Sequence, residues 1–337
     1  MDAAGELRRL VNGFQVSQAL HVAAVLGISD ALADGPCTVP ELAAAVGAHE
    51  RSLHRLLRAL ASVGVYTGDE QGRFANTELG QALRSDTPGS VAGWAALVGR
   101  PYYLQAWAGL LDSVRTGRNA FTAVHGESIW AYRAQRPDEL AIFDRAMTAL
   151  SAAVAGAVAG AYDFARFSTV VDVGGGHGGL LTAILTRYPL LHGVLFDQPD
   201  VVAGATAQLE RAGVTDRCQL VGGDFFHALP DIGTDTPTAV VLKAVIHDWP
   251  DAESVAILGA CHRAMAGSGT LLLVEQLLDD GPDPSRTAFA DLNMLVAPGG
   301  QERTTDEYRA LLAHAGFRLH RTIPTGTDVF VLEATPT

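Results

Sequence analysis

The chain has 337 residues, of which 48% are hydrophobic and 18% are charged, and its formal net charge at pH 7 is −13. This length and composition are typical of one large or two ordinary globular domains and exclude a disordered chain. The negative charge disfavours a nucleic-acid partner, because binding to phosphates needs clustered Lys and Arg side chains.

The cysteines and the most apolar segment bear on the environment of the protein. Cys37, Cys218 and Cys261 are far apart and have no metal-like spacing, which favours a reduced, cytoplasmic protein. Residues 1–10 mix acids with bases and contain no apolar run, so we predict no signal peptide. Residues 146–162 are rich in Ala and Gly and fall short of the roughly 20 strongly apolar residues that cross a membrane. We therefore expect a buried helix there and no membrane partner.

The first third of the chain predicts helices followed by a small hairpin. Thr38 and Glu41 are spaced as a capping box for a short helix that ends near Gly47. A second helix, at about 50–63, places its leucines on one face, and turn residues at 68–72 then predict a hairpin. Helix, helix, hairpin is the order of elements in a winged helix.

Two interpretations of this winged-helix-like segment stay open. One is DNA recognition by a transcription regulator, and the other is a structural or dimerisation module of the same shape. The second helix offers only Arg51, His54, Arg55 and Arg58 to DNA, within an acidic chain. Because phosphate contacts supply most non-specific affinity, this scarcity favours the structural or dimerisation module.

Residues 90–165 predict further helices, and the pattern changes at about residue 168. Short apolar strands then alternate with helical stretches, which predicts a parallel, doubly wound α/β sheet. The strand segments are STVVDV (168–173), HGVLFD (192–197), CQLVGGD (218–224), AVVLKAVI (239–246) and TLLLVEQ (270–276). RLHRTI (318–323) and DVFVLEAT (328–335) lie too close together for an intervening helix and predict an antiparallel edge hairpin. We place a helical domain at 1–165 and the sheet domain at 166–337.

Chemically distinctive residues follow five consecutive strands of this sheet. They are the glycine run 174–179, Asp197, Asp224 with Phe225, His247, and Glu275. Ligands of open α/β sheets bind beyond the carboxyl ends of the strands, so we expect these residues to share one ligand-binding rim. Asp197 is placed to accept hydrogen bonds from ribose hydroxyls, and Asp224 with Phe225 suits an adenine.

The glycine run is typical of a loop that approaches a cofactor. Glycines let the backbone come close to a ligand and open the next helix. Gly174, Gly176 and Gly179 satisfy the spacing GxGxxG, which is also the fingerprint of dinucleotide-binding proteins. An NAD-dependent oxidoreductase therefore stays an alternative at this point.

His247 is a candidate general base. It follows the fourth of these strands in the polar and aromatic run HDWPD, and histidine titrates near neutral pH and can take a phenolic proton. Glu275, one strand along, could hold the ring and stabilise the imidazolium. The alternative is a structural histidine that caps the helix beginning at Asp251. The spacing alone favours neither interpretation.

Six ordered motifs resemble those of the plant caffeate-type O-methyltransferase family, and more closely its actinobacterial branch that decorates aromatic natural products. They are VVDVGGGHGG (170–179), LFDQPDVV (195–202), GGDFF (222–226), LKAVIHDWPDAE (242–253), LLLVEQLL (271–278) and PGGQERT (298–304). The resemblance covers nearly the whole chain. It implies a winged-helix-like dimerisation domain, a Rossmann-like S-adenosylmethionine domain, and a homodimer formed through the N-terminal domain.

Carried over position by position, the resemblance implies which residues bind the cofactor and which carry the chemistry. Contacts to S-adenosylmethionine are implied for Gly174, Asp197, Asp224, Phe225 and Lys243, and Gly176 of the same glycine run is assigned with them. His247 is implied as the catalytic base, with Glu275 and Glu302 flanking it.

The resemblance also implies an aromatic acceptor. Phe143 and Met147 match positions that clamp such an acceptor, and Asn293 and Met294 match the opposite wall. For Phe143 and Met147, core packing at i and i+4 stays an equal alternative. We therefore expect a metal-independent S-adenosylmethionine-dependent O-methyltransferase that acts on a hydroxyl of a small natural product, with a phenolic hydroxyl favoured. The alternative within the family keeps the cofactor but performs another reaction on a polyketide-like substrate.

Overall fold

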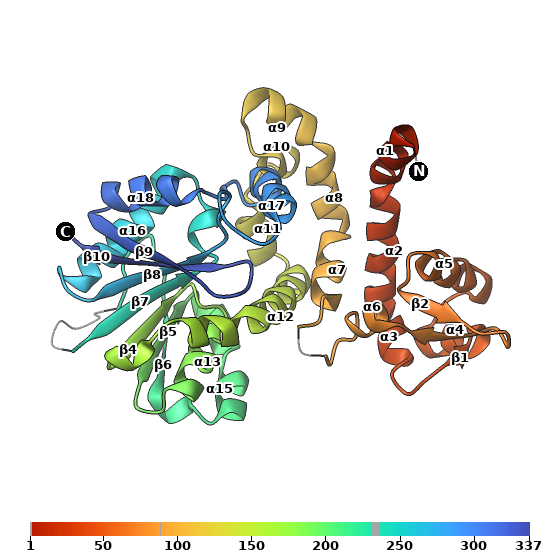
Figure 1. Ribbon diagram of the computed structural model, residues 1–337, viewed down its shortest axis with the longest axis horizontal. Coiled ribbons are helices and arrows are strands. Elements are labelled where there is room, and N and C mark those ends of the chain that lie inside the picture. Colours follow the sequence, from red (N-terminus) through yellow and green to blue (C-terminus); the bar gives the residue numbers. More distant parts are fainter. Residues whose placement is uncertain (1, 88, 231–235) are drawn as a thin grey trace. The chain divides into compact units, whose positions relative to one another are not determined.

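The computed structural model describes residues 2–87, 89–230 and 236–337. The chain divides into two compact units that are interleaved in sequence (Figure 1). The first comprises Met1–Gln105 and Arg133–Leu150, and the second comprises Ala106–Tyr132 and Ser151–Thr337. The predicted division into a helical domain at 1–165 and a sheet domain at 166–337 stays a prediction.

The first unit begins with helices and a small antiparallel sheet. Its elements are α1 (Ala3–Val11), α2 (Gly13–Leu26), α3 (Ile28–Ala31), β1 (Cys37–Thr38), α4 (Val39–Val46), α5 (Glu50–Ser62), β2 (Tyr66–Gly68), β3 (Arg73–Asn76), α6 (Glu78–Gln81), α7 (Ala92–Val98) and the greater part of α8 (Pro101–Ala108). The predicted capping box of Thr38 and Glu41 is confirmed, and the left-handed Gly47 ends α4. Leu53, Leu57 and Leu60 on α5 are buried, as their spacing predicts.

The predicted order of helix, helix and hairpin is also confirmed. β2 and β3 form the hairpin, with Thr67 opposite Ala75. β1 adds a third strand next to β3, which the sequence did not suggest because the strand is two residues long. The helices that follow in the chain are α9 (Leu110–Thr116), α10 (Ala120–His125), α11 (Ile129–Ala134) and α12 (Pro137–Ala161).

The long helix α12 contains the most apolar segment of the chain. The predicted helix is confirmed but its burial only in part, because Val158 and Ala159 are buried whereas Ala152, Gly156 and Gly160 are exposed. Within the described ranges, no single helix has the length and apolar character of a membrane span. One pair of helical segments, Pro137–Ala152 and Val154–Ala161, bent by 42°, meets those two criteria together by length and composition.

The second unit is built on a seven-stranded sheet in the order β6-β5-β4-β7-β8-β10-β9. Its strands are β4 (Thr169–Val173), β5 (His192–Asp197), β6 (Cys218–Gly222), β7 (Thr238–Lys243), β8 (Thr270–Glu275), β9 (Phe317–Pro324) and β10 (Phe330–Pro336). The first five strands pair in parallel, and β10 runs antiparallel to both β8 and β9. The predicted Rossmann-like sheet with an antiparallel edge hairpin is confirmed.

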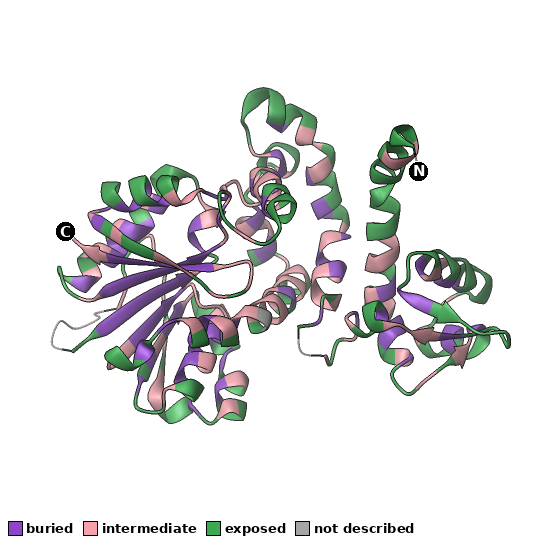
Figure 2. Ribbon diagram, viewed as in Figure 1, coloured by how far each residue is buried: buried purple, intermediate pink, exposed green. Residues whose placement is uncertain are grey.

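Helices cover both faces of this sheet (Figure 1). One face is covered by the C-terminal part of α12 with α13 (Gly179–Arg187), α14 (Pro199–Ala203) and α15 (Thr206–Ala212), and the other by α16 (Asp251–Met265) and α18 (Thr305–His314). The remaining helix of this part of the chain, α17 (Pro284–Val296), contacts α9 and α10. Val170 in β4 packs on the face with α13, and its neighbour Val171 packs on the face with α16 and α18. Because both faces are covered, the central strands β4, β7 and β8 consist mostly of buried apolar residues (Figure 2), whereas the edge strand β6 is only partly buried.

The strand order reverses next to β4, and this reversal positions the site. From β4 the chain moves to β5 and β6 on one side, and then crosses to β7 and β8 on the other. The loops after β4 and β7 therefore leave the sheet in opposite directions at adjacent strand ends. A topological switch point of this kind is where open α/β sheets bind their ligands.

Candidate active site

The glycine run forms the loop between β4 and α13. Gly174, Gly176 and Gly178 have φ angles of 68°, 59° and 77°, in the left-handed region that residues with a Cβ rarely adopt. A Cβ on Gly174 would lie 2.8 Å from Cγ2 of Val245, in the segment that leads to His247. The glycines are thus needed for the backbone conformation and for close packing between the loops that follow β4 and β7.

Asp197, at the end of β5, holds this loop in place. Its Oδ2 accepts a hydrogen bond from the backbone N–H of Gly176 at 2.8 Å, and its Oδ1 accepts one from Gln198 at 2.7 Å. Burial raises the pKa of Asp197, whereas these two backbone donors lower it. The sequence predicted a ribose contact for this carboxylate, and the structure adds a direct bond to the glycine loop.

Asp172 lies beneath the same loop and was missed by the sequence analysis. Its side chain is buried, and neither carboxyl oxygen has a hydrogen-bond partner among the described residues. A Cβ on Gly175 would lie 2.7 Å from its Cγ, so the carboxyl group directly underlies the loop. Burial raises the pKa of Asp172 to about 7, although the charge of Lys243 opposes the rise. An acid inside the apolar run VVDV was the signal available in the sequence.

Lys243 ends β7 next to this acid. Burial lowers the pKa of Lys243, while the negative charges of Asp172, Glu275 and Asp248 raise it. Lys243 therefore lies at the end of the sheet within electrostatic reach of Asp172 and of two carboxylates next to His247. An electrostatic partner of this kind makes the burial of Asp172 less costly.

Asp224 and Phe225 follow β6 and adjoin a cluster of aromatic rings. Asp224 is exposed, and its Oδ1 accepts a hydrogen bond from the N–H of Phe226 at 2.9 Å. The ring of Phe225 meets Phe226 edge to face at 5.1 Å and Trp249 at 6.0 Å. Trp130 on α11 stacks on Trp249, with the two planes 24° apart. An exposed carboxylate beside aromatic rings suits a flat base that has an amino group.

His247 lies in a short turn, Ile246–Asp248, between β7 and α16. It does not cap α16, because Pro250 is the N-cap residue of that helix. Instead, Nδ1 of His247 lies 2.9 Å from Oε1 of Glu302 and 3.8 Å from Oε2 of Glu275. Nε2 lies 3.6 Å from Oδ1 of Asp248. The ring is only 14% exposed, so these three carboxylates surround a largely dehydrated imidazole.

Glu275 and Glu302 both lie next to His247, as expected, but Glu302 makes the hydrogen bond to the ring that was expected of Glu275. Oε1 of Glu275 accepts hydrogen bonds from the backbone N–H groups of Ile246 at 3.0 Å and Val245 at 3.3 Å. The 3.8 Å from its other oxygen to His247 is too long for a hydrogen bond. Glu275 therefore fixes the backbone that precedes the histidine and acts on the ring through its charge.

The carboxylates determine the charge of the histidine. Burial alone would lower the pKa of His247, but the charges of Glu302, Glu275 and Asp248 together raise it to about 10. Burial raises the pKa of Glu275 to about 7, against the influence of the His247 charge. In this state of the protein, His247 therefore carries both ring protons at neutral pH, and Glu302 balances the imidazolium.

The predicted acceptor residues are divided between the two units. Phe143 and Met147 lie on the part of α12 that belongs to the first unit, where the guanidinium of Arg133 lies 3.9 Å from the centre of the Phe143 ring. Asn293 and Met294 lie on α17 in the second unit, and Met294 is buried. Their shared role at an acceptor stays a prediction. Among the described residues, no group of three or more His, Cys, Asp or Glu is arranged to hold a metal ion.

Two family models match the chain. The model of an O-methyltransferase domain matches residues 107–318, and that of an O-methyltransferase dimerisation domain matches residues 8–86. The chain belongs to the O-methyltransferase family. The winged-helix-like segment of this methyltransferase thus falls within a dimerisation domain, which favours the second of the two interpretations that the sequence left open.

The methyltransferase is similar to characterised enzymes over nearly its whole length. It is 44% identical to a phenazine O-methyltransferase of Lysobacter antibioticus, covering 98% of this chain and 95% of the relative. It is 41% identical to a mitomycin biosynthesis 6-O-methyltransferase of Streptomyces lavendulae, covering 94% and 90%. A relative of Streptomyces purpurascens that is 36% identical over 94% of this chain and 86% of its own length is an aclacinomycin 10-hydroxylase.

Solved structures identify the cofactor of the family. An O-methyltransferase from neocarzinostatin biosynthesis, in complex with S-adenosylmethionine and 2-hydroxy-5-methyl naphthoic acid, has a TM-score of 0.80 and 35% identity over 96% of each chain. This methyltransferase is an S-adenosylmethionine-dependent enzyme. Its left-handed glycine loop and the carboxylate of Asp197 fit that cofactor, because they offer a close backbone approach beside an acceptor for ribose hydroxyls. An oxidoreductase using NAD is no longer an alternative.

Proposed function

We propose that this methyltransferase transfers a methyl group to a phenolic hydroxyl of a small aromatic natural product, with His247 as the general base. The observation that carries the proposal is the pair formed by His247 and Glu302 at the switch point of the sheet. A histidine whose one nitrogen is bound by a buried carboxylate presents its other nitrogen to a substrate. The packing of Val245 against Gly174 supports a site shared with the cofactor loop.

The residues assigned to the cofactor hold it by complementary chemistry. Gly174 and Gly176 allow the backbone to approach, and Asp197 accepts hydrogen bonds from ribose hydroxyls. Asp224 and Phe225 receive the adenine at the aromatic cluster, and Lys243 supplies a positive charge at the end of β7. S-adenosylmethionine, when bound, supplies the electrophilic methyl group on its sulfonium.

His247 acts as the base in its neutral form, which has its proton on Nδ1 and which the raised pKa makes a minor form at neutral pH, and Nε2 of this form removes the proton of the acceptor hydroxyl. Nδ1 keeps its proton and donates a hydrogen bond to Glu302, so the imidazolium that forms is stabilised by a charge-assisted hydrogen bond. Glu275 and Asp248 stabilise the same positive charge from 3.8 Å and 3.6 Å. General-base catalysis of this kind contributes about 10²–10⁴-fold, while positioning two reactants can contribute roughly 7–11 kcal/mol. Positioning is therefore the larger part of catalysis.

Phe143, Met147, Asn293 and Met294 are proposed to contact the aromatic acceptor. The support is the chemistry of relatives, which include a phenazine O-methyltransferase and an O-methyltransferase in complex with a naphthoic acid. A homodimer formed through the N-terminal domain is proposed as well, supported by the match of residues 8–86 to a dimerisation domain. The prediction of a cytoplasmic protein stays a prediction.

Incubation with methyl-labelled S-adenosylmethionine and a panel of acceptors tests the proposed function. The panel contains hydroxyphenazines, hydroxynaphthoic acids and hydroxybenzoates, each paired with its dehydroxylated analogue, and products are scored by mass spectrometry. We expect label in at least one phenol and none in the matched analogues. Cofactor binding without any methylated phenol would contradict the proposal.

A second candidate is a different reaction on a polyketide-like substrate with the same cofactor. The observation that favours it is the 36% identity to an aclacinomycin 10-hydroxylase, which shows that this sequence family also contains a hydroxylase. The same mass analysis separates the two candidates once a polyketide-like substrate, molecular oxygen and a reductant are added to the panel, because a hydroxylated product gains an oxygen atom and carries no methyl label.

A further inference from the structure

Arg303 is a fully buried arginine next to Glu302, and no role follows for it from the proposed mechanism. Only 1% of its surface is exposed, and it lies one residue before Thr304, the N-cap of α18. Burying a guanidinium is costly unless its N–H groups and its charge are satisfied. The partners of this side chain therefore indicate what it stabilises.

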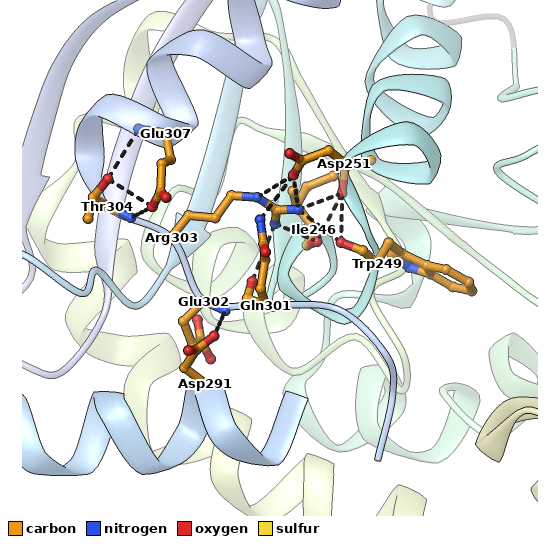
Figure 3. A network of polar contacts seen from close by, with 10 residues as sticks. Ile246, Trp249, Asp251, Asp291, Gln301, Glu302, Arg303, Thr304 and Glu307 are labelled. Atoms are coloured by element: carbon orange, nitrogen blue, oxygen red, sulfur yellow. Dashed lines mark hydrogen bonds and ion pairs between the residues drawn. The ribbon is translucent and has the colours of Figure 1, made fainter. Parts of the chain in front are cut away.

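The guanidinium binds the backbone on both sides of His247. Nη1 donates to the carbonyl oxygen of Ile246 at 3.2 Å, and Nη2 donates to that of Trp249 at 3.0 Å. Nε and Nη2 also bind Oδ1 of Asp251, at 3.1 Å and 2.7 Å. Figure 3 shows the side chain reaching from the segment before α18 to these groups. One side chain thus restrains the turn from residue 246 to residue 251, which carries the histidine.

The residues before Arg303 pack closely against the same turn. The N–H of Gln301 donates to the carbonyl oxygen of His247 at 2.9 Å. A Cβ on Gly300 would lie 2.1 Å from that oxygen, so only glycine allows the approach. We name residues 300–303 the clip. Because the clip contains Glu302, it places this carboxylate next to the imidazole of His247 and at the same time binds the backbone of His247.

The clip is also fixed to the end of β8. The N–H of Leu278 donates to the carbonyl oxygen of Arg303 at 3.1 Å, and Leu277 forms a parallel bridge with Arg303. Glu275 lies two residues before Leu277. On the other side, Oδ1 of Asp291 on α17 accepts the N–H of Glu302 at 3.0 Å. Arg303 therefore joins the three chain segments that carry His247, Glu275 and Glu302.

We propose that Arg303 is a positioning residue that sets the distance between His247 and Glu302. The proposal rests on the proposed role of His247 as the base. At 2.9 Å the two side chains form a hydrogen bond, whereas the 3.8 Å between His247 and Glu275 is only an ion-pair distance. A displacement of about 1 Å therefore removes the hydrogen bond that orients the ring.

Substitutions of Arg303 test this in the full-length protein. Arg303→Met removes all the guanidinium bonds, and Arg303→Lys retains the charge but not the paired donation to Ile246 and Trp249. Arg309→Met is the matched control, because Arg309 is an exposed arginine on α18 that pairs with Asp306. The readouts are the ionisation of His247, followed by NMR of histidine-labelled protein, the Kd for S-adenosylmethionine, and kcat with the best acceptor of the panel.

We expect Arg303→Met to lower the pKa of His247 and to reduce kcat by about 10–100-fold, with the Kd for the cofactor changed less than three-fold. Arg303→Lys should recover part of both effects, and Arg309→Met should match the parent. If Arg303→Met fails to fold, Gly300→Ala and Asp251→Asn disturb the same contacts from the clip and from the partner carboxylate. An unshifted His247 titration in Arg303→Met, or in both substitutes, overturns the proposal.

The two readouts separate the positioning role from the proposed function. The NMR titration reports the contact between His247 and Glu302 whether or not the protein turns over. If Arg303→Met shifts that titration while His247→Ala keeps full methyl transfer, the base role fails and the positioning stands. If His247→Ala loses turnover but Arg303→Met leaves titration and kcat unchanged, the base role stands and the positioning fails.

Discussion

Nδ1 of His247 and Oε1 of Glu302 lie 2.9 Å apart, although the two residues are 55 positions apart in the chain. The bond fixes which ring nitrogen faces the protein and which is presented to an acceptor. It also places a buried negative charge where the imidazolium forms during proton transfer. Both consequences can be measured with single substitutions.

Replacement of His247 by alanine should reduce kcat by about 10²–10⁴-fold, the usual contribution of a general base. The Kd for S-adenosylmethionine should stay within a factor of about three, because none of the cofactor residues is altered. Steady-state kinetics and calorimetry measure the two quantities. His192→Ala, at an exposed position at the start of β5, serves as the control. Full turnover in His247→Ala would falsify the assignment of the base.

The pH dependence of catalysis should report the carboxylates around the histidine. Because the pKa of His247 is raised to about 10, its neutral form becomes more abundant as the pH rises from 7 toward 10. We therefore expect kcat/KM of the parent enzyme to increase over this range, to reach half of its maximum near pH 10 and to level off above it. A pH–rate profile with a non-titrating aromatic amine or alcohol as comparison acceptor separates this effect from ionisation of the phenol.

Glu302→Gln should shift that profile toward lower pH, because the substitution removes the carboxylate that contributes most to the raised pKa of His247. The plateau should fall about 10–100-fold, since a hydrogen bond to a charged group is worth roughly 1.5–3 kcal/mol. The loss of kcat/KM at pH 7 should be smaller than the loss at pH 10, because the lower pKa leaves more of His247 neutral at pH 7 in the variant than in the parent. Glu253→Gln, at an exposed position on α16, is the control. A Glu302→Gln profile that coincides with the parent profile would contradict the role of this bond.

Much of the fold could be predicted because its signals are local. Alternating apolar strands and helices predicted the sheet, and the capping residues Thr38 and Glu41 predicted the start of α4. The glycine run and Asp197 could be assigned to one rim, because parallel strands end at the same edge of a sheet. Each of these predictions needs only neighbouring residues and a general rule of chain geometry.

The polar contacts at His247 could not be predicted in this way. Glu275 was expected to hold the ring because it ends the strand next to β7, yet its Oε1 accepts hydrogen bonds from backbone N–H groups. Glu302 reaches the ring only because Gly300 and Arg303 pack the clip against the turn at 246–251. Contacts between segments more than 50 residues apart depend on the tertiary structure, which residue types alone do not reveal.

Asp172→Asn should change how stability depends on pH. The pKa of Asp172 is raised from 3.8 to about 7, so the folded protein binds a proton that the unfolded chain releases. The unfolding free energy of the parent therefore decreases as the pH rises from about 4 to 7. The unfolding free energy of the variant should not show this decrease, because the asparagine binds no proton. The variant-minus-parent difference should rise by about 4 kcal/mol over this range, since one pKa unit corresponds to about 1.4 kcal/mol. Urea unfolding at a series of pH values, with Glu210→Gln as an exposed control, measures it. A difference that stays constant with pH would rule out a titrating Asp172.

Asp197→Ala should weaken binding of S-adenosylmethionine. The substitution removes the proposed ribose contacts and the bond that holds the N–H of Gly176. With about 1.5–3 kcal/mol for a hydrogen bond to a charged group, we expect the Kd to rise by about 10–100-fold. Calorimetric titration measures the change, with Asp200→Ala at an exposed position on α14 as the control. Equal affinity in Asp197→Ala and Asp200→Ala would remove Asp197 from the cofactor site.

Charged substitutions on the first two helices should convert the proposed homodimer into a monomer. Leu10 and Phe14 are 59% and 64% exposed within the segment that matches the dimerisation domain. Large apolar side chains exposed in this way are typical of surfaces that another chain covers. Leu10→Glu and Phe14→Glu should each lower the sedimentation coefficient to that of a monomer, because a buried unpaired carboxylate is costly at an interface. Leu190→Glu is the matched control, since Leu190 is 91% exposed and lies outside that segment. A dimer that persists in both variants would place the interface elsewhere, and a parent protein that sediments as a monomer would refute the homodimer.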